Sequence, residues 1–286
     1  MSIRIIMTPM SGLEGADASL ETALQVGRMF EAHVESFHVT SDPRDSVAYM
    51  AEGMTSNMIQ NIMDAVDDEG RQRLDRARAQ FGALCAKFDV PVSDARNKDG
   101  FGASFVNAVG REEDHIAHRG RLTDLIVAGR SDSNDGSART TLEIALLETG
   151  RPVLVAPPRV PASFGKTLAI AWNGSAEAAH AIGAGLPFLS AAESVSILVV
   201  PEGARSGAPA SELINYLACH GIDASARPID ASEAKIGRAL MDAASGSGID
   251  MLVMGAYTHS RLRHLMFGGA TSGILEHAEI PVLMQH

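Results

Sequence analysis

Short apolar segments alternate with amphipathic segments along the C-terminal part of the chain. The apolar segments are rich in β-branched residues and predict strands, whereas the segments between them have the period of a helix. The expected strands are residues 167–172, 195–200, 222–229, 250–255 and 281–284, and the expected helices are 176–189, 209–220, 232–244 and 268–278. Strands that are apolar on both faces and alternate with helices are typical of a mainly parallel sheet covered on both sides.

The N-terminal part repeats this alternation. Its expected strands are residues 3–7, 34–39, 92–96, 124–129 and 152–155, and its expected helices are 17–31, 68–88, 101–118 and 140–148. The sequence therefore predicts an α/β fold of Rossmann-like type. We expect two tandem, open, mainly parallel five-stranded sheets with helices on both faces.

Two pairs of matching segments indicate an internal repeat. Residues 124–129 (DLIVAG) match 250–255 (DMLVMG), and residues 152–155 (PVLV) match 281–284 (PVLM). The first strands of the two copies lie about 163 positions apart, but the fourth strands lie only 126 apart. The first copy must therefore hold an insertion, which falls after its second strand.

These offsets define the expected domains. The first copy covers residues 1–156 with its insertion near 41–67, and the second covers 164–286. Residues 157–163 join them and include prolines, which a helix interior or a central strand does not accept, so we interpret them as a linker.

The insertion carries methionines at helical spacing. Met50, Met54 and Met58 follow each other every four residues, and Ile62 and Val66 continue the same face. One interpretation is an extra helix packed on its own domain. The alternatives are an adaptable surface for a partner or an apolar ligand, or a dimer contact.

Composition excludes several classes of protein. The net charge is −11 and no basic stripe is present, which argues against a nucleic-acid binder. Cys85 and Cys219 are too few for a disulfide framework or a cysteine-based zinc site, and they fit a reducing compartment. No apolar run approaches the ~20 residues that cross a bilayer, and no signal peptide is recognised. We expect a cytoplasmic protein without a membrane segment.

The order of elements, with residues 172–175 (WNGS) and the stretch 254–284, resembles the universal stress protein family. The resemblance covers nearly the whole chain. Nucleotide-binding members of that family carry G-x2-G-x9-G-[ST] after the fourth strand. In this chain Gly255 and Gly268 occupy the first and third positions, but Thr258 and Gly269 replace the expected glycine and hydroxyl residue.

The resemblance implies an adenine pocket beside the second strand, near Val199. It implies that ribose and phosphates lie between the turn at Asn173 and Gly174 and the loop at Gly268. The remaining candidate contacts of that loop are Gly269, Ala270 and Thr271. Glycines at a helix N-terminus expose backbone N–H groups to which a phosphate can bind closely.

Two features of this candidate site differ from the family pattern. Asn173 stands where members tend to have aspartate, and an amide offers no carboxylate, so Mg²⁺ would be held less tightly beside a bound ATP. The corresponding slot of the first copy falls at about Met10, and no double glycine precedes its last helix. No phosphate site is assigned to the first copy.

Three functions remain open from the sequence. The first is a regulatory stress-tolerance module that binds ATP or a related adenine nucleotide in its C-terminal domain. The second is a nucleotide-independent scaffold in which the glycines only allow close packing and the insertion is the working surface. The third is a slow ATPase or related enzyme, but no nucleophile is paired with an oriented base, so no catalytic residue and no metal site is predicted.

The resemblance also implies assembly through the last strands of the copies. Two tandem copies can imitate a dimer within one chain, and a further homodimer is consistent with this arrangement.

Overall fold

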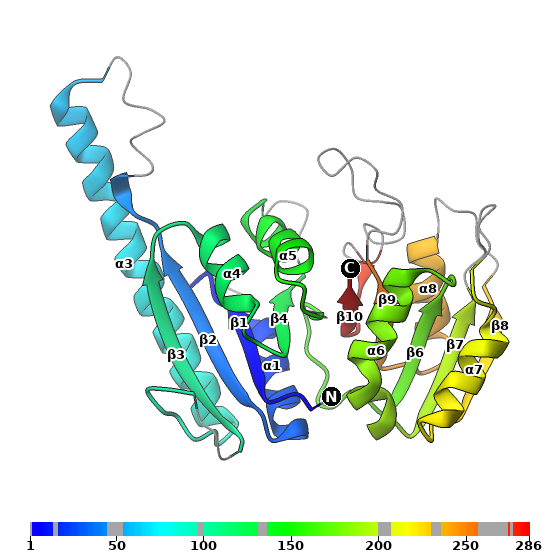
Figure 1. Cartoon of the computed structure of the whole chain (residues 1–286). Coiled ribbons are helices and arrows are strands. Elements are labelled where there is room, and N and C mark those ends of the chain that lie inside the picture. Colours follow the sequence, from blue (N-terminus) through cyan, green and yellow to red (C-terminus); the bar gives the residue numbers. More distant parts are fainter. Residues whose placement is uncertain are drawn as a thin grey trace. The chain divides into compact units, whose positions relative to one another are not determined.

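The computed structural model of the chain describes residues 2–13, 17–44, 54–96, 100–130, 136–199, 207–229, 236–256, 274 and 277–286. The chain divides into two compact units (Figure 1). One unit is Arg4–Val127, and the other is Ala128–His286 with Met1–Ile3. Both are α/β structures, which confirms the predicted fold class.

The first unit holds a parallel sheet in the order β3-β2-β1-β4. Its strands are β1 (Ile5–Pro9), β2 (His33–Thr40), β3 (Gly102–Val109) and β4 (Leu125–Gly129). Its helices are α1 (Asp17–Phe30), α3 (Ser56–Lys87) and α4 (Glu112–Gly120).

Helices cover both faces of this sheet. Gly27 of α1 lies close against Val34 of β2. Three residues further along the strand, Phe37 points to the opposite face and stacks against His115 of α4. Alternating side chains of β2 therefore face α1 on one side and α4 on the other.

The third strand of the first copy was predicted at the wrong place. Within the predicted segment 92–96, Val92 forms only an isolated bridge to Ala103, and the predicted helix 101–118 begins as strand β3. All eight residues of β3 pair with β2, and Phe105 packs against Phe81 of α3. Tertiary pairing therefore overrides the local helical pattern. Gly110, with a φ of 136°, separates this strand from α4.

The second unit holds six strands in the order β5-β10-β9-β6-β7-β8. Its strands are β5 (Val153–Ala156), β6 (Thr167–Trp172), β7 (Ser194–Val199), β8 (Ala224–Pro228), β9 (Met251–Gly255) and β10 (Val282–Gln285). Its described helices are α5 (Gly136–Glu148), α6 (Ala176–Ala191), α7 (Ala210–Cys219) and α8 (Ile236–Ser245). In Figure 1, α6 and α7 lie in front of this sheet and α8 lies behind it. The helix predicted at 268–278 falls outside the described residues except at 274, 277 and 278.

The last strands of the two copies pair with each other in antiparallel orientation. Leu154 of β5 lies opposite Leu283 of β10, and Val155 lies opposite Val282. All of these side chains are fully buried. The pairing that the resemblance implied for the last strands is therefore present within one chain, whereas the predicted domain boundaries remain a prediction.

One aspartate fastens the start of the first strand in each copy. Asp124 accepts hydrogen bonds from the backbone N–H groups of Arg4 and Ile5. Asp250 accepts them from Gly165, Lys166 and Thr167. The equivalence of these aspartates supports the repeat that was inferred from residues 124–129 and 250–255.

Much of the insertion lengthens the second helix of the first copy. α3 has 32 residues, whereas its counterpart α7 has 10. Thr55 caps α3 by accepting a hydrogen bond from the N–H of Met58, and no residue of α3 before Ala77 is buried. Met58 is 51% exposed, so in the described part of this segment the predicted methionine face is not core. Met50 lies outside the described residues.

Candidate ligand-binding site

The carboxyl ends of β6 and β9 form the candidate site. β6 lies between β7 and β9. After β6 the chain continues with the neighbouring strand β7, and it later returns as β9 beside the opposite edge of β6. Ligands of open α/β sheets bind outside the carboxyl ends of the strands at such a switch point. The structure places Asn173 and Gly174 directly after β6 and Gly255 at the end of β9.

The turn after β6 prepares the start of α6. Asn173 accepts a hydrogen bond at Oδ1 from the N–H of Ser175, at 3.1 Å. Gly174 has a φ of 74°, which favours glycine. Ser175 then caps α6 by accepting a hydrogen bond at Oγ from the N–H of Ala178, at 3.2 Å. The turn therefore presents the N-terminus of a 16-residue helix at the switch point.

A second segment is held against this turn. A Cβ on Gly174 would lie 2.7 Å from the Cα of Gly207, which is closer than real contacts allow. The indole Nε1 of Trp172 donates a hydrogen bond to the carbonyl oxygen of Ala208, at 2.9 Å. Trp172 is buried, so the backbone just before α7 is fixed beside the candidate site.

Gly255 allows β9 to approach α6. A Cβ at this position would lie 2.5 Å from the backbone nitrogen of Ala178 and 2.9 Å from the Cβ of Glu177. This first glycine of the family-like loop therefore has a packing role, because any side chain would separate the strand from the helix N-terminus.

The predicted site residues are only partly within the described structure. Val199 ends β7, where it pairs with Trp172 and Pro228 and is half-buried. Four of the predicted residues thus lie at the carboxyl ends of neighbouring strands: Asn173, Gly174, Val199 and Gly255. The other predicted residues, Thr258, Gly268, Gly269, Ala270 and Thr271, lie outside the described residues.

The first copy contains an equivalent turn, which corrects the sequence alignment. Gly12 has a φ of 69°, and Ser11 accepts a hydrogen bond at Oγ from the N–H of Leu13. Ser11 therefore corresponds to Asn173, and Met10 corresponds to Trp172. The position that corresponds to Asn173 is therefore one residue after Met10, because the glycines of the two turns align with each other.

Buried contacts hold the residue just before the turn of the first copy. Met10 is buried, its sulfur lies 2.7 Å from Ser36 Oγ, and its carbonyl oxygen contacts His38 Nδ1 at 2.6 Å. Burial lowers the pKa of His38, and Arg73 and Arg78 lower it further against the opposing effect of the hydrogen bond to Met10.

Helix α3 also holds this turn. Arg76 donates a hydrogen bond from Nε to the carbonyl oxygen of Gly12, and Gln80 donates one from Nε2 to that of Leu13. Gly12 packs directly on the backbone of Arg73. This turn is therefore fixed by internal contacts.

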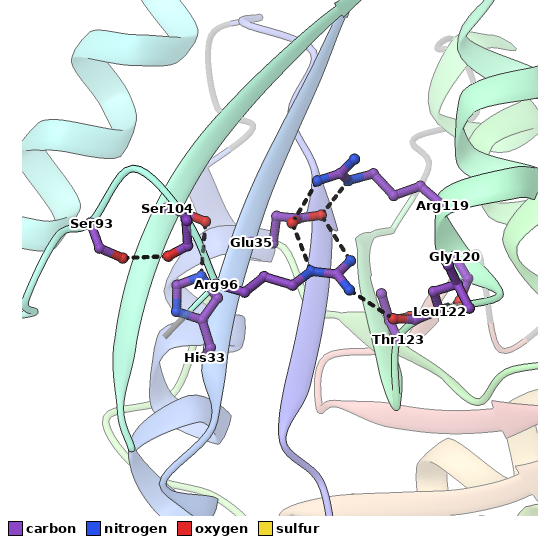
Figure 2. Close-up of polar contacts among 10 residues, drawn as sticks. His33, Glu35, Ser93, Arg96, Ser104, Arg119, Gly120, Leu122 and Thr123 are labelled. Carbon is purple, nitrogen blue, oxygen red and sulfur yellow. Dashed lines mark hydrogen bonds and ion pairs between the residues drawn. The ribbon is translucent and has the colours of Figure 1, made fainter. Parts of the chain in front are cut away.

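Sequence reasoning missed a buried charged cluster on β2 (Figure 2). The Glu35 side chain is 1% exposed, and Arg96 and Arg119 both bind its carboxylate. Arg96 donates from Nε to Oε2 at 3.1 Å, and Arg119 donates from Nη2 to Oε2 at 2.7 Å. His33 lies two residues before Glu35, and its Nε2 is 2.8 Å from Ser104 Oγ.

Electrostatics in this cluster favour the ion pairs. Burial by itself raises the pKa of Glu35, but the hydrogen bonds and charges of Arg119 and Arg96 outweigh it, so the pKa lies below its ordinary value. The hydrogen bond to Glu35 raises the pKa of Arg119. Burial lowers the pKa of His33, with a further contribution from Arg96 that opposes the effect of Glu35. A glutamate within a predicted strand was the available signal, but its partners lie 61 and 84 residues away.

Metal and membrane features were also considered. Within the described ranges, no group of three or more histidine, cysteine, aspartate or glutamate side chains could hold a metal ion. No helix in the described part of the chain is long and apolar enough to cross a membrane.

The fold and the turn geometry define the second unit as a doubly wound α/β domain with glycines at its switch point. Comparison with known families gives the second step. Residues 166–286 match the model described as the Universal stress protein family. This match confirms the resemblance recognised in the sequence for residues 166–286.

Solved structures extend the shared fold to the whole chain. A universal stress protein from Archaeoglobus fulgidus DSM 4304 superposes with a TM-score of 0.65 at 13% identity, covering 98% of this chain and 97% of that one. A putative universal stress protein from Pseudomonas aeruginosa UCBPP-PA14 superposes with a TM-score of 0.56 at 15% identity, covering 99% and 93% of the two chains. At these identities the likeness establishes the fold.

A curated relative matches over a short segment. The universal stress protein Slr1230 of Synechocystis sp. is 51% identical over 37 residues, which are 13% of each chain. The matched segment thus spans far less than two thirds of that relative.

Proposed function

We propose that this chain is a regulatory module of the stress response whose C-terminal copy binds an adenine nucleotide. The proposal rests on the arrangement of residues at the carboxyl ends of β6 and β9. There, Asn173 and Gly174 open a capped helix, and Gly255 brings β9 against the N-terminus of that helix. A helix N-terminus at a switch point favours an anionic ligand, and the sequence adds glycines 268 and 269.

The proposal assigns one nucleotide to each chain. In the first copy, His38 contacts the carbonyl oxygen of Met10, and α3 holds the carbonyls of Gly12 and Leu13. In the second copy, Asn173 keeps both amide N–H groups as donors because its hydrogen bond to Ser175 uses the oxygen.

The polar groups at this turn are better suited to hydrogen-bond a nucleotide than to coordinate Mg²⁺. Mg²⁺ prefers oxygen ligands, mainly carboxylates and phosphates. The oxygen of Asn173 already accepts a hydrogen bond from Ser175, and the first turn of α6 contributes one acidic residue, Glu177. We therefore expect ATP to bind with little dependence on Mg²⁺, mainly through its own contacts with the protein.

Thermal unfolding with AMP, ADP and ATP, with and without Mg²⁺, tests the proposal. A ligand at ~100 times its dissociation constant stabilises the native state by about 2.7 kcal/mol. Gly269→Val should remove this stabilisation while the ligand-free protein still unfolds cooperatively. Gly82→Val, at a helix position with open space around it, is the matched control and should keep the stabilisation. No stabilisation of the wild type by any of the three nucleotides would refute nucleotide binding.

A second candidate function, a nucleotide-independent partner-binding module, is favoured by α3. The part of this helix before Gly70 has no buried residue, and Gly70 marks the point where α3 approaches Thr40 of its own unit. An amphipathic helix that exposes methionine can serve as an adaptable contact surface. Deleting residues 45–67 should then abolish partner capture without unfolding the chain, whereas Gly269→Val should leave capture unchanged.

A further inference from the structure

The first copy buries two histidines on β2, and one of them lies next to the charged cluster of Glu35. His33 is 1% exposed and contacts Ser104 of β3, while Arg96 reaches the same region from the segment before β3. We propose that His33 and the Glu35–Arg96–Arg119 cluster form an acid-responsive fastening that releases β3 and α4 from β2 when His33 is protonated.

The cluster ties two other elements to strand β2. Glu35 belongs to β2, Arg96 belongs to the segment before β3, and Arg119 belongs to the last turn of α4 (Figure 2). Arg96 also donates a hydrogen bond from Nη1 to the carbonyl oxygen of Leu122, just after α4. Loss of these contacts would loosen the segment that leads into β3 and helix α4 together.

Charge balance makes this fastening sensitive to one added proton. Glu35 carries one negative charge, whereas Arg96 and Arg119 each carry one positive charge, so the three side chains already sum to a positive charge. The charged groups that act on His33 are Glu35 on its own strand and Arg96 on the neighbouring segment, while Arg119 from α4 faces Glu35. Protonation would place a second unbalanced positive charge where burial already disfavours one.

Among the described residues, the strand of the second copy that corresponds to β2 lacks this histidine and glutamate. The backbone N–H of His33 bonds to the carbonyl of Arg4, and the N–H of Ser194 bonds to that of Lys166 in the same way. Ser194 therefore occupies the position of His33 in the second copy, and Ser196 occupies the position of Glu35. The second copy has hydroxyl groups at both places and provides an internal reference that does not titrate.

Hydrogen–deuterium exchange of the full chain between about pH 7 and about pH 5 tests the proposal across the range in which histidine titrates. After correction for intrinsic exchange, protection of β3 and α4 should fall relative to β6 and β7. One proton accounts for at most about a tenfold loss of protection per pH unit. His33→Gln should abolish this relative loss, because glutamine keeps a polar group near Ser104 but does not titrate. His118→Gln, which changes an exposed histidine of α4, is the matched control and should retain it.

An unchanged acid response in His33→Gln would overturn the proposal, as would equal loss of protection in β6 and β7. If His33→Gln does not fold, NMR titration of the wild-type imidazoles decides instead. Titration of His33 together with the loss of β3 protection supports the fastening. Titration of His33 without any loss of β3 protection contradicts it.

Discussion

Single residues of β2 carry the buried charge of the first copy. Glu35 is compatible with its 1% exposure only because two guanidinium groups satisfy its oxygens. The sequence revealed the glutamate within a predicted strand, but not its partners. Partners so distant along the chain are brought together by the fold, and local pattern has no access to them.

Glu35→Gln should destabilise the first copy. The substitution removes the negative charge and leaves two cations facing each other, so we expect a loss of about 2–4 kcal/mol in the free energy of unfolding. Urea denaturation measures this change. Glu143→Gln, in the exposed pair with Arg139, should cost about 0.3–0.5 kcal/mol. Equal losses in the two variants would show that the buried cluster contributes no more than a surface pair.

Acid should lower stability in two stages. His33 and His38 have pKa values below the ordinary 6.5, so the unfolded state binds more protons than the folded state just below that pH. Stability should therefore begin to fall as pH drops through 6.5. Glu35, with a pKa below its ordinary 4.5, adds a further loss as pH falls through its lowered value. Urea midpoints that stay constant from neutral to acidic pH would contradict this order.

The two cysteines should differ in reactivity. Burial raises the pKa of Cys85 to about 11, and its side chain is buried, whereas Cys219 is exposed. Because the thiolate is the reactive form, a thiol-specific chromogenic reagent should label one cysteine quickly in the native chain and both after unfolding. Cys219→Ser should abolish the fast phase, and a fast phase that persists in this variant would contradict the assignment.

At the scale of elements, strands with a strong apolar pattern were predictable from the sequence, whereas β3 was not. The prediction of 167–172 matches β6, and 124–129 contains β4, because both strands are buried and carry strong apolar patterns. β3 lies at an edge and alternates small, polar and apolar residues, so only its pairing with β2 identifies it. Likewise, the turn after β6 was predictable from its glycine, but the contact of Gly174 with Gly207 depends on tertiary structure.

Glycines at the ends of the fourth strands provide a matched test of packing. Gly255→Ala should force β9 away from α6, since its Cβ would lie 2.5 Å from the Ala178 nitrogen, and we expect a loss of about 1–3 kcal/mol. Gly129→Ala, at the equivalent place in the first copy, finds no atom within 4 Å and should be nearly neutral. Thermal unfolding compares the two variants, and equal effects would contradict the packing role of Gly255.

At the scale of the whole molecule, the two copies of the repeat differ in the residues that surround the turn after their first strand. The second unit presents a helix N-terminus beside Asn173, whereas the equivalent turn of the first copy is held by Met10, His38 and α3. The family and the order of elements could be recognised from the sequence because matching segments recur in both copies. The contacts that hold the turn of the first copy could not be predicted, since they depend on α3 returning from far along the chain.

Isothermal titration calorimetry with AMP, ADP and ATP tests the central claim most directly. The account predicts one adenine nucleotide per chain, similar binding of ATP with and without Mg²⁺, and loss of binding in Gly269→Val. The single tryptophan, Trp172, lies beside the turn, so its fluorescence should change in the same titration. No binding at millimolar nucleotide, or two nucleotides per chain, would contradict the account.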